Sequence, residues 1–292
     1  MIINMKKKKI KIPFKLALVG LFFSKVESIW PWLAHRWFVK IFFSTARFEL
    51  PFAEQKALDS ATRSSVTFEN MNIQMYEWGE GVPVLFVHGW MGRATQFHEF
   101  IPVFNHAGFK VISFDSTGHG LSDGSRSHLM EFTGIINILT ARYGKFKMIV
   151  GHSLGGVASL HAVRQFQATD QLVMLASPTI AQEIVEEFRK KIGASKKCEV
   201  YFERYIQATY GQRFEEYSAS HIISEIKGLD LFLVYDQNDR EVSMKNPEIM
   251  LHRYPEAKMM ITEGLGHNRI LKDKEVIEST LTFLKNSEVV MA

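Results

Sequence analysis

Cysteine is nearly absent from this chain of 292 residues, which contains only Cys198. A single thiol forms no disulfide within the chain, and it excludes zinc sites that are built from several cysteines. The cysteine content therefore calls for no oxidising compartment. No cluster of residues has metal-ligand spacing, and no glycine-rich loop fits a phosphate cradle. We predict neither a metal nor another cofactor.

A strong charge of one sign and a long apolar run are also lacking. The 35 Lys and Arg exceed the 31 Asp and Glu only slightly, and a formal net charge of +4 is too small to predict nucleic-acid binding. The apolar run at residues 16–23 is too short to span a bilayer. Because 46% of the residues are hydrophobic, the chain can form the core of one enzyme-sized domain with additions.

The N-terminal segment is basic and then aromatic. Residues 6–9 and 11 are lysines, and residues 29–43 combine tryptophan and phenylalanine with basic residues. One interpretation is a helix in a membrane interface, with peripheral membrane contact through residues 6–43. The other is a helix packed on the domain or on a partner subunit. Cleaved export is less favoured than either, because no convincing cleavage site follows. We expect a cytoplasmic protein, associated with the inner membrane face under the first interpretation.

The most informative stretch places a serine between two glycines where a strand gives way to a helix. Residues 148–150 predict a buried strand, and the small and apolar residues 157–163 predict a helix. Ser153 lies at the turn, in the pattern of a nucleophile elbow. Gly151 and Gly155 are needed because a Cβ would collide with the neighbouring strand or helix.

Two later segments supply a candidate acid and a candidate base. Residues 229–235 predict a buried strand, and Asp239 lies in the polar segment that follows. Residues 257–262 predict another strand, followed by a flexible turn with His267. In a doubly wound sheet the loops at the carboxyl ends of the strands gather at one edge, so these side chains can converge on Ser153. Asp236, in the same loop as Asp239, stays an alternative acid.

The strand predicted at residues 84–88 leads into Gly89 and Trp90. Acyl transfer passes through a tetrahedral oxyanion, and two backbone N–H groups aimed at it lower the barrier by several kcal/mol. We assign these donors to Trp90 and to Leu154, the residue after the serine. Gly89, His152 and Gly156 are expected to support the elbow and its neighbouring loop.

Other polar residues near these loops are interpreted as structural. A histidine beside a strand end is more often hydrogen-bonded in place than a base, and this applies to His88 and His152. A strand at residues 111–114 precedes a glycine-rich turn. Asp115 and His119 are expected to brace that turn.

The chain resembles the α/β-hydrolase superfamily in five ordered segments, which are His88-Gly-Trp, Asp115-Ser-Thr-Gly-His-Gly-Leu-Ser, Gly151-His-Ser-Leu-Gly-Gly, Asp236-Gln-Asn-Asp-Arg and Gly264-Leu-Gly-His. The resemblance covers about residues 65–287 and is closest to esterase, lysophospholipase and monoacylglycerol-lipase-like members. It implies an α/β fold with a mostly parallel central sheet, helices on both faces and a helical cap inserted before the acid-bearing strand. It assigns the catalytic triad to Ser153, Asp239 and His267 and the oxyanion hole to Trp90 and Leu154.

Two positions depart from the pattern of this superfamily. Ser116 and Thr117 stand where another residue followed by proline is commoner, and Asp236 stands where a small residue is usual. Neither departure removes a catalytic group.

The alternation of strands and helices stops between residues 178 and 227, where this fold commonly carries a lid. Residues 180–191 have apolar residues at helical spacing, and residues 200–210 form a second helical candidate rich in aromatics. These helices either roof an apolar acyl pocket or are simply core. We therefore expect an N-terminal basic and aromatic helical extension (1–60), a first part of the hydrolase core (61–177), a helical cap (178–227) and a second part of the core (228–292).

The predicted function is a serine hydrolase that cleaves carboxylic esters of small apolar or lipid-derived acyl groups through an acyl-enzyme. Ser153 attacks the acyl carbon, His267 transfers the proton and Asp239 orients the imidazole. A thioesterase, a C–C hydrolase or an acyltransferase on the same fold is the alternative. A membrane-associated binding protein that keeps the fold without turnover is a second alternative, from another class. The predicted partner is a small-molecule ester, with no nucleic acid and no assigned oligomeric state.

Overall fold

The computed structural model describes residue 23 and residues 25–286. The packing of the chain divides it into two compact units, which we describe separately. The larger unit joins Phe43–Ala181 to the described residues from Phe214 onward. The smaller unit joins the described residues up to Phe42 to Gln182–Arg213.

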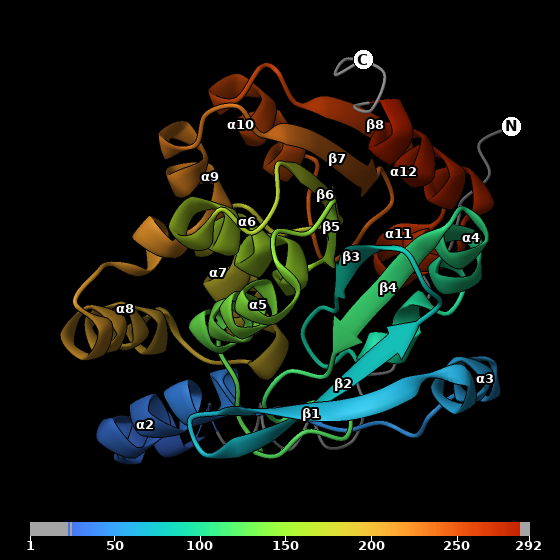
Figure 1. The fold of residues 1–292 in the computed structure, drawn as a ribbon. Coiled ribbons are helices and arrows are strands. Elements are labelled where there is room, and N and C mark those ends of the chain that lie inside the picture. Colours follow the sequence, from blue (N-terminus) through green and yellow to red (C-terminus); the bar gives the residue numbers. More distant parts are fainter. Residues whose placement is uncertain (1–22, 24, 287–292) are drawn as a thin grey trace, which may run out of the picture. The chain divides into compact units, whose positions relative to one another are not determined.

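The larger unit is built on one sheet, whose strands lie in the order β1-β2-β4-β3-β5-β6-β7-β8 (Figure 1). The strands are β1 (Thr62–Phe68), β2 (Met71–Trp78), β3 (Val82–Val87), β4 (Phe109–Phe114), β5 (Ile149–His152), β6 (Gln171–Leu175), β7 (Asp230–Asp236) and β8 (Lys258–Thr262). β2 pairs antiparallel with β1 and with β4, while the other neighbouring strands pair parallel. The predicted α/β fold with a mostly parallel sheet is confirmed.

Helices cover both faces of this sheet. They are α3 (Phe52–Ser60), α4 (Phe100–His106), α5 (Leu129–Tyr143), α6 (Leu154–Phe166), α9 (Ala219–Ile222), α10 (Lys245–Arg253), α11 (Gly266–Arg269) and α12 (Lys274–Asn286), with 3-10 turns at η1 (Ala94–Phe97), η2 (Phe214–Tyr217), η3 (Ile223–Glu225) and η4 (Ile270–Lys272). Along β3, Leu85 and Val87 join the hydrophobic cluster of α5 and α6, while Val84 and Phe86 join that of α4 and α12. A strand that is buried on both faces has a continuous run of apolar residues in the sequence, as β3 does.

The parallel pairing places the site residues together. Strands β3, β5, β7 and β8 run in the same direction, so their carboxyl ends meet at one edge of the sheet. The loops after these four strands carry the predicted oxyanion donors, nucleophile, acid and base. The sheet therefore brings to one edge residues that are far apart in the sequence, such as Gly89 and His267, which are separated by 178 positions.

The smaller unit contains the helices α2 (Pro31–Phe42), α7 (Ala181–Ile192) and α8 (Lys196–Tyr210). Phe38 of α2 is fully buried and its ring centroid lies 5.1 Å from that of Phe188 in α7 and 6.0 Å from that of Phe202 in α8. Arg189 forms an ion pair with Glu199 at 3.0 Å, which joins α7 to α8. The N-terminal helix α2 is thus packed within the chain, against two helices of the predicted cap region.

None of the described helices has both the length and the hydropathy that crossing a bilayer requires. The lysines at residues 6–9 and 11 and the apolar residues 16–22 lie outside the described residues. The predicted membrane contact therefore depends, among the described residues, on α2 and the residues just before it.

Candidate active site

Ser153 occupies a strained turn between β5 and α6. Its φ is +51° and its ψ is −124°, a conformation that residues other than glycine rarely adopt. A Cβ on Gly155 would lie 2.3 Å from the carbonyl oxygen of Val87, and one on Gly151 would lie 2.4 Å from the Cα of Gly156. The close approach of α6 to β3 and β5 thus requires glycine at both positions, for the reason expected from the sequence.

His267 and Asp239 contact one another directly. His267 Nδ1 lies 2.8 Å from Asp239 Oδ2, and the side chain of Asp239 is almost fully buried. Because a carboxylate accepts this hydrogen bond, Nδ1 carries the proton when the imidazole is neutral. The other ring nitrogen, Nε2, then has a free lone pair.

The second oxygen of Asp239 is held by the backbone of its own loop. Asp239 Oδ1 accepts hydrogen bonds from the N–H groups of Glu241 at 2.7 Å and Val242 at 3.1 Å. Burial by itself would raise the pKa of Asp239, but the contact with His267 and these two N–H groups outweigh it and lower the pKa below its ordinary value. Asp239 is therefore a fixed carboxylate facing the imidazole.

Asp236, the alternative acid, has a different set of partners. Its Oδ2 accepts hydrogen bonds from Thr262 Oγ1 at 2.8 Å and from the N–H of Leu265 at 2.9 Å, two residues before His267. Its Oδ1 accepts the N–H of Asn238 at 2.9 Å. Asp236 thus ties β7 to the loop that carries the base. Sequence reasoning missed this anchoring role, although a buried carboxylate at the end of a strand is a signal for it.

His152 links the loop of His267 to the elbow. Its Nε2–H donates to the carbonyl oxygen of His267 at 2.9 Å, and the two ring centroids lie 4.9 Å apart. Burial, and then the neighbouring His267, lower the pKa of His152 to about 3, so the ring is neutral at physiological pH. Among the residues that the structure describes, Ser153 Oγ is not hydrogen-bonded to His267.

The two predicted oxyanion donors flank the serine. Leu154 is the first residue of α6, and Trp90 follows Gly89, on which a Cβ would lie 2.7 Å from Ser153 Cβ. Within the described part of the chain, neither the N–H of Leu154 nor that of Trp90 has a hydrogen-bond partner. Both N–H groups are thus available, one of them at the positive end of a helix dipole.

His88 holds the backbone next to this loop. Its Nε2 accepts the N–H of Ser116 at 2.9 Å, so its Nδ1–H donates to the carbonyl oxygen of Gly89 at 2.7 Å. Full burial lowers the pKa of His88 to about 4, with a smaller opposing effect from the Gly89 contact. The neutral ring therefore ties the β3 loop to the β4 loop, which is the structural role expected for it.

Asp115 braces the glycine-rich turn, because its Oδ2 accepts the N–H of Leu121 at 2.9 Å. Asp115 and His119 also contact the loop after β3. His119 Nε2 accepts the N–H of Met91 at 3.1 Å, and Asp115 Oδ1 accepts the N–H of Ala94 at 2.8 Å. Asp115 Oδ2 also accepts the hydroxyl of Tyr76 at 2.7 Å. These contacts hold the segment that contains Trp90. They also stabilise the strained backbone of Met91, whose φ is +55°.

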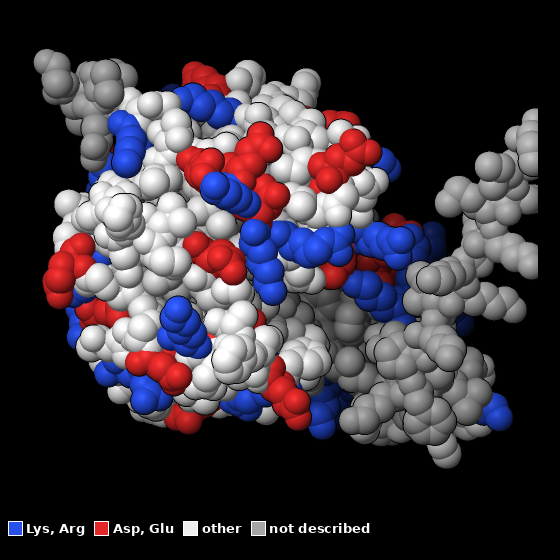
Figure 2. Space-filling model, turned by 90° about the vertical axis from the view of Figure 1, so that its right-hand side faces the viewer, with Lys and Arg blue, Asp and Glu red and all other residues white. Residues whose placement is uncertain are grey.

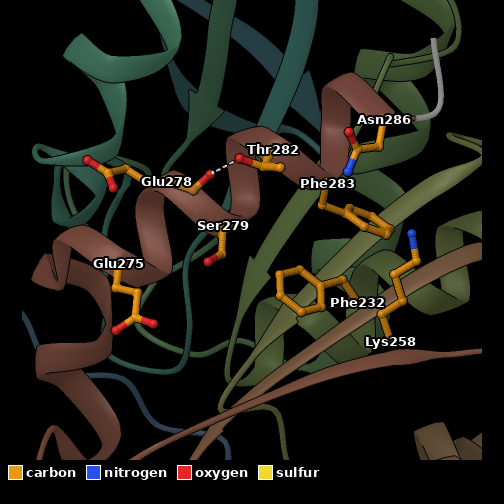
Figure 3. A pocket seen from close by; sticks show the side chains of 8 residues that line it. All are labelled: Phe232, Lys258, Glu275, Glu278, Ser279, Thr282, Phe283 and Asn286. Atoms are coloured by element: carbon orange, nitrogen blue, oxygen red, sulfur yellow. Dashed lines mark hydrogen bonds between the residues drawn. The ribbon is translucent and has the colours of Figure 1, made fainter. Parts of the chain in front are cut away.

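A separate hollow of about 400 Å³ lies beside α12 (Figure 3). It is lined by Phe232, Lys258, Glu275, Glu278, Ser279, Thr282, Phe283 and Asn286. Phe232 and Lys258 pair with each other near the amino ends of β7 and β8, whereas the triad candidates follow the carboxyl ends. Ligands of open α/β sheets bind at the carboxyl ends, so this hollow is not the candidate active site.

Comparisons with known proteins agree with this fold. Residues 82–278 match the Hydrolase_4 family model, described as serine aminopeptidase, S33. The human "Serine hydrolase-like protein" is 34% identical over 115 residues, which are 36% of this chain and 56% of that protein. The "sn-1-specific diacylglycerol lipase ABHD11" of Danio rerio is 28% identical over 129 residues, 42% of this chain and 40% of that protein. The chain thus spans about half the length of these curated relatives.

A solved structure extends the likeness over most of the chain. The structure of an esterase of Pyrococcus furiosus superposes with a TM-score of 0.63 and 17% identity, covering 84% of this chain and 97% of that one. At this identity the likeness shows the fold, which is that of the α/β hydrolases. With the match to the family model over residues 82–278, the chain belongs to the Hydrolase_4 family of serine hydrolases.

Proposed function

We propose that the protein hydrolyses carboxylic esters, with Ser153 as nucleophile, His267 as general base and Asp239 as the carboxylate that orients the imidazole. The observation that carries the proposal is the 2.8 Å contact between His267 Nδ1 and Asp239 Oδ2. It occurs on a loop that His152 holds beside the strained turn of Ser153. Nucleophile, orienting acid and base follow one another in the chain order that this fold uses.

The contacts support one role in catalysis for each of the three residues. Because Asp239 accepts the proton on Nδ1, Nε2 of His267 is free to take the proton of the Ser153 hydroxyl as the oxygen attacks the acyl carbon. The imidazolium then gives this proton to the leaving alcohol, which leaves an acyl-enzyme. A water molecule, deprotonated in the same way, releases the acid. The hydrogen bond between serine and base commonly tightens only when substrate is bound.

The N–H groups of Leu154 and Trp90 are the proposed oxyanion donors. They have no competing partner in the described structure. The loop that carries Trp90 is held by His88, His119 and Asp115, and Leu154 is held as the first residue of α6. Donors fixed before the reaction need no reorganisation as the negative charge develops on the substrate oxygen.

A small apolar or lipid-derived ester is the proposed substrate class. The similarity to a diacylglycerol lipase supports an acyl ester of a lipid. On the face drawn in Figure 2, acidic and basic side chains are interspersed among uncharged ones, and the net charge is only +4. This distribution offers no large field of one sign that would attract a highly charged substrate.

Ser153→Ala tests the nucleophile. We expect the variant to lose hydrolysis of a series of aryl esters and labelling by a fluorophosphonate, which reacts only with an activated serine, while its circular dichroism is unchanged. Ser279→Ala, in the hollow beside α12, is the matched control and should keep both activities. Unlabelled, inactive wild-type protein would favour a non-catalytic binding protein, and an active Ser153→Ala variant would move the nucleophile elsewhere.

We also propose a peripheral membrane contact through the N-terminal segment. Trp30, just before α2, and Trp32 of α2 are 54% and 60% exposed, whereas Ala34 and Phe38 of α2 are fully buried. The segment thus presents one face to α7 and α8 and an aromatic face to solvent. Aromatic residues bury well in a membrane interface, and each basic residue near an anionic surface adds about 1 kcal/mol of attraction that salt screens.

Vesicle sedimentation tests this contact. The full chain should sediment with vesicles that contain phosphatidylglycerol, and less so at high salt. The double variant Trp30→Ser, Trp32→Ser should bind more weakly and stay folded, because both side chains are exposed. Phe52→Ser, at a 94% exposed aromatic residue of the larger unit, is the control. Equal binding of all three proteins would argue against a contact through the aromatic face.

A further inference from the structure

Three side chains of different chemistry converge in the smaller unit. A carboxylate oxygen of Glu27, a ring nitrogen of His35 and the sulfur of Cys198 all lie within 4.8 Å of one another. Glu27 precedes α2, His35 lies on α2, and Cys198 lies in the first turn of α8. More than 160 residues separate His35 from Cys198, so no motif spacing in the sequence reveals the group.

One ring nitrogen of the histidine in this group has no hydrogen-bond partner among the described residues. His35 Nε2 is buried, and it makes no hydrogen bond to any residue that the structure describes. The ring is stacked on Tyr201, with centroids 5.0 Å apart and planes at 25°, which holds it in position. A buried nitrogen without a hydrogen-bond partner is uncommon in folded proteins and points to a bound water, ion or other ligand.

The carboxylate is oriented by the start of α8. Glu27 accepts hydrogen bonds from both the backbone N–H, at 3.2 Å, and the hydroxyl of Ser195, the N-cap residue of that helix. Hydrogen bonds of this kind fix the direction of a carboxylate that binds a metal. Cys198 is fully buried, and burial together with Glu27 raises the pKa of its thiol to about 12, so the sulfur is protonated when no cation is bound.

We propose that Glu27, His35 and Cys198 bind one Zn²⁺ ion, with a water molecule as the fourth ligand. Sulfur, imidazole nitrogen and carboxylate oxygen are the three donor types that zinc takes in proteins. In a tetrahedral site with ordinary bond lengths the ligand atoms lie about 3.5 Å apart, so the three side chains need to close by about 1 Å. Binding displaces the thiol proton of Cys198 to solvent and leaves a zinc-bound thiolate.

The site joins α2 to α8 within the smaller unit. Its residues do not belong to the proposed triad, so the inference does not depend on ester hydrolysis. The single cysteine excludes zinc sites with several thiolates, but it leaves a site with one thiolate open. We therefore expect zinc to stabilise the packing of the N-terminal helix on α8.

Cobalt binding tests the proposal directly. The full chain, free of any affinity tag and stripped with a chelator, is titrated with Co²⁺ and followed in the near ultraviolet, where a thiolate bound to cobalt absorbs. Because Cys198 is the only cysteine of the chain, such a band has one source. We expect a 1:1 titration, loss of the band on adding Zn²⁺, and no band with Cys198→Ser.

Two further variants and a control identify the other ligands. Glu27→Gln and His35→Ala should weaken Co²⁺ binding about tenfold or more, since even the outer partners of metal ligands contribute that much. His252→Ala, at an exposed histidine of the larger unit, should bind as the unchanged chain does. A band of unaltered affinity in both Glu27→Gln and His35→Ala would assign the metal to other side chains and overturn the proposal.

Thermal melting gives a second readout on the unchanged protein. Zn²⁺ should raise the Tm of the full chain and of His252→Ala, and should leave that of Glu27→Gln nearly unchanged. If Cys198→Ser fails to fold, this comparison still tests whether zinc binds at Glu27, His35 and Cys198. Absence of both the cobalt band and the Tm shift at millimolar metal would mean that the three side chains form only a hydrogen-bonded cluster.

Discussion

Asp236 and Asp239 stand three residues apart in one loop, yet their carboxylates have different partners. Asp239 accepts the proton of His267 Nδ1, while Asp236 accepts backbone and hydroxyl protons that anchor the loop of the base. We predict that Asp239→Asn lowers kcat by about 10³-fold or more, because the amide no longer holds the imidazole in the required tautomer. Steady-state hydrolysis of an aryl ester measures the loss.

Asp236→Asn is the matched control for that prediction. Its amide NH₂ would face the N–H groups that the carboxylate now accepts, so we expect a loss of about 1–3 kcal/mol in the free energy of unfolding. The change in kcat should be several-fold at most. If Asp236→Asn lost activity more severely than Asp239→Asn while remaining folded, the acid would have to be reassigned.

The histidines around the serine predict a simple pH profile. Burial lowers the pKa values of His88, His119 and His152 to about 4, 3 and 3, so these rings stay neutral from pH 5 to 8. The proposed base works only when neutral, and the rate of acyl transfer should therefore rise with pH through one ionisation. We expect that His88, His119 and His152 add no step to the profile of kcat/KM between pH 5 and 8. Two resolved steps in this range would contradict the neutral state of these three rings.

The residues of the candidate site were largely predictable, but their contacts were not. The five ordered segments single out the candidates because each follows the carboxyl end of a strand or lies in a glycine-rich turn. The choice between Asp236 and Asp239 depends on the conformation of a polar loop, which no periodicity encodes. The group of Glu27, His35 and Cys198 depends on helix packing between distant segments, which spacing in the sequence cannot reveal.

Among the elements, α6 packs closely against β3 and β5 at the proposed site. A Cβ on Gly155 would lie 2.3 Å from the carbonyl oxygen of Val87 and 2.5 Å from that of His88. Because neither backbone atom can move without shifting β3, we predict that Gly155→Ala lowers the free energy of unfolding by about 3 kcal/mol or more. Urea unfolding measures this effect.

Gly228→Ala is the control, because it introduces backbone strain without a steric clash. Gly228 has a φ of +69° but no atom within 4 Å of an added Cβ, so the substitution costs backbone strain alone, about 1–2 kcal/mol. An equal or smaller loss for Gly155→Ala would mean that α6 can move away from β3.

Most of the strands that are buried on both faces were predictable, because their residues form continuous apolar runs. The strands expected at residues 84–88, 111–114, 148–150 and 229–235 correspond to β3, β4, β5 and β7 within a few residues, whereas the buried strand β6 was missed. The strand expected at residues 257–262 corresponds to β8, which is a partly exposed edge strand. The hairpin of β1 and β2 was missed, since β1 is half exposed and mostly polar. Its two-residue turn, Glu69-Asn70, has positive φ at both positions, and asparagine there was an available signal.

For the whole molecule, buried neutral histidines couple stability to pH. His161 is 1% exposed, and burial lowers its pKa to about 4. The pKa of this histidine in the unfolded chain is about 6.5. Between about pH 6.5 and pH 4 the unfolded chain therefore binds more protons than the folded chain, so the free energy of unfolding decreases as the pH falls. We predict that His161→Gln removes about 2 kcal/mol of the difference in unfolding free energy between pH 7 and pH 5. Urea unfolding at the two pH values measures it, and an unchanged difference would contradict the prediction.

The smaller unit also has a consequence for the order of biosynthesis. Phe188 of α7, which packs on Phe38 of α2, is translated 150 residues after Phe38. At roughly 5–20 residues per second, the rings of α2 wait on the order of ten to thirty seconds for their partners. During that interval the apolar face of α2 stays exposed to solvent. It can bind a chaperone or a membrane surface first, and α7 and α8 then have to displace that partner when they fold.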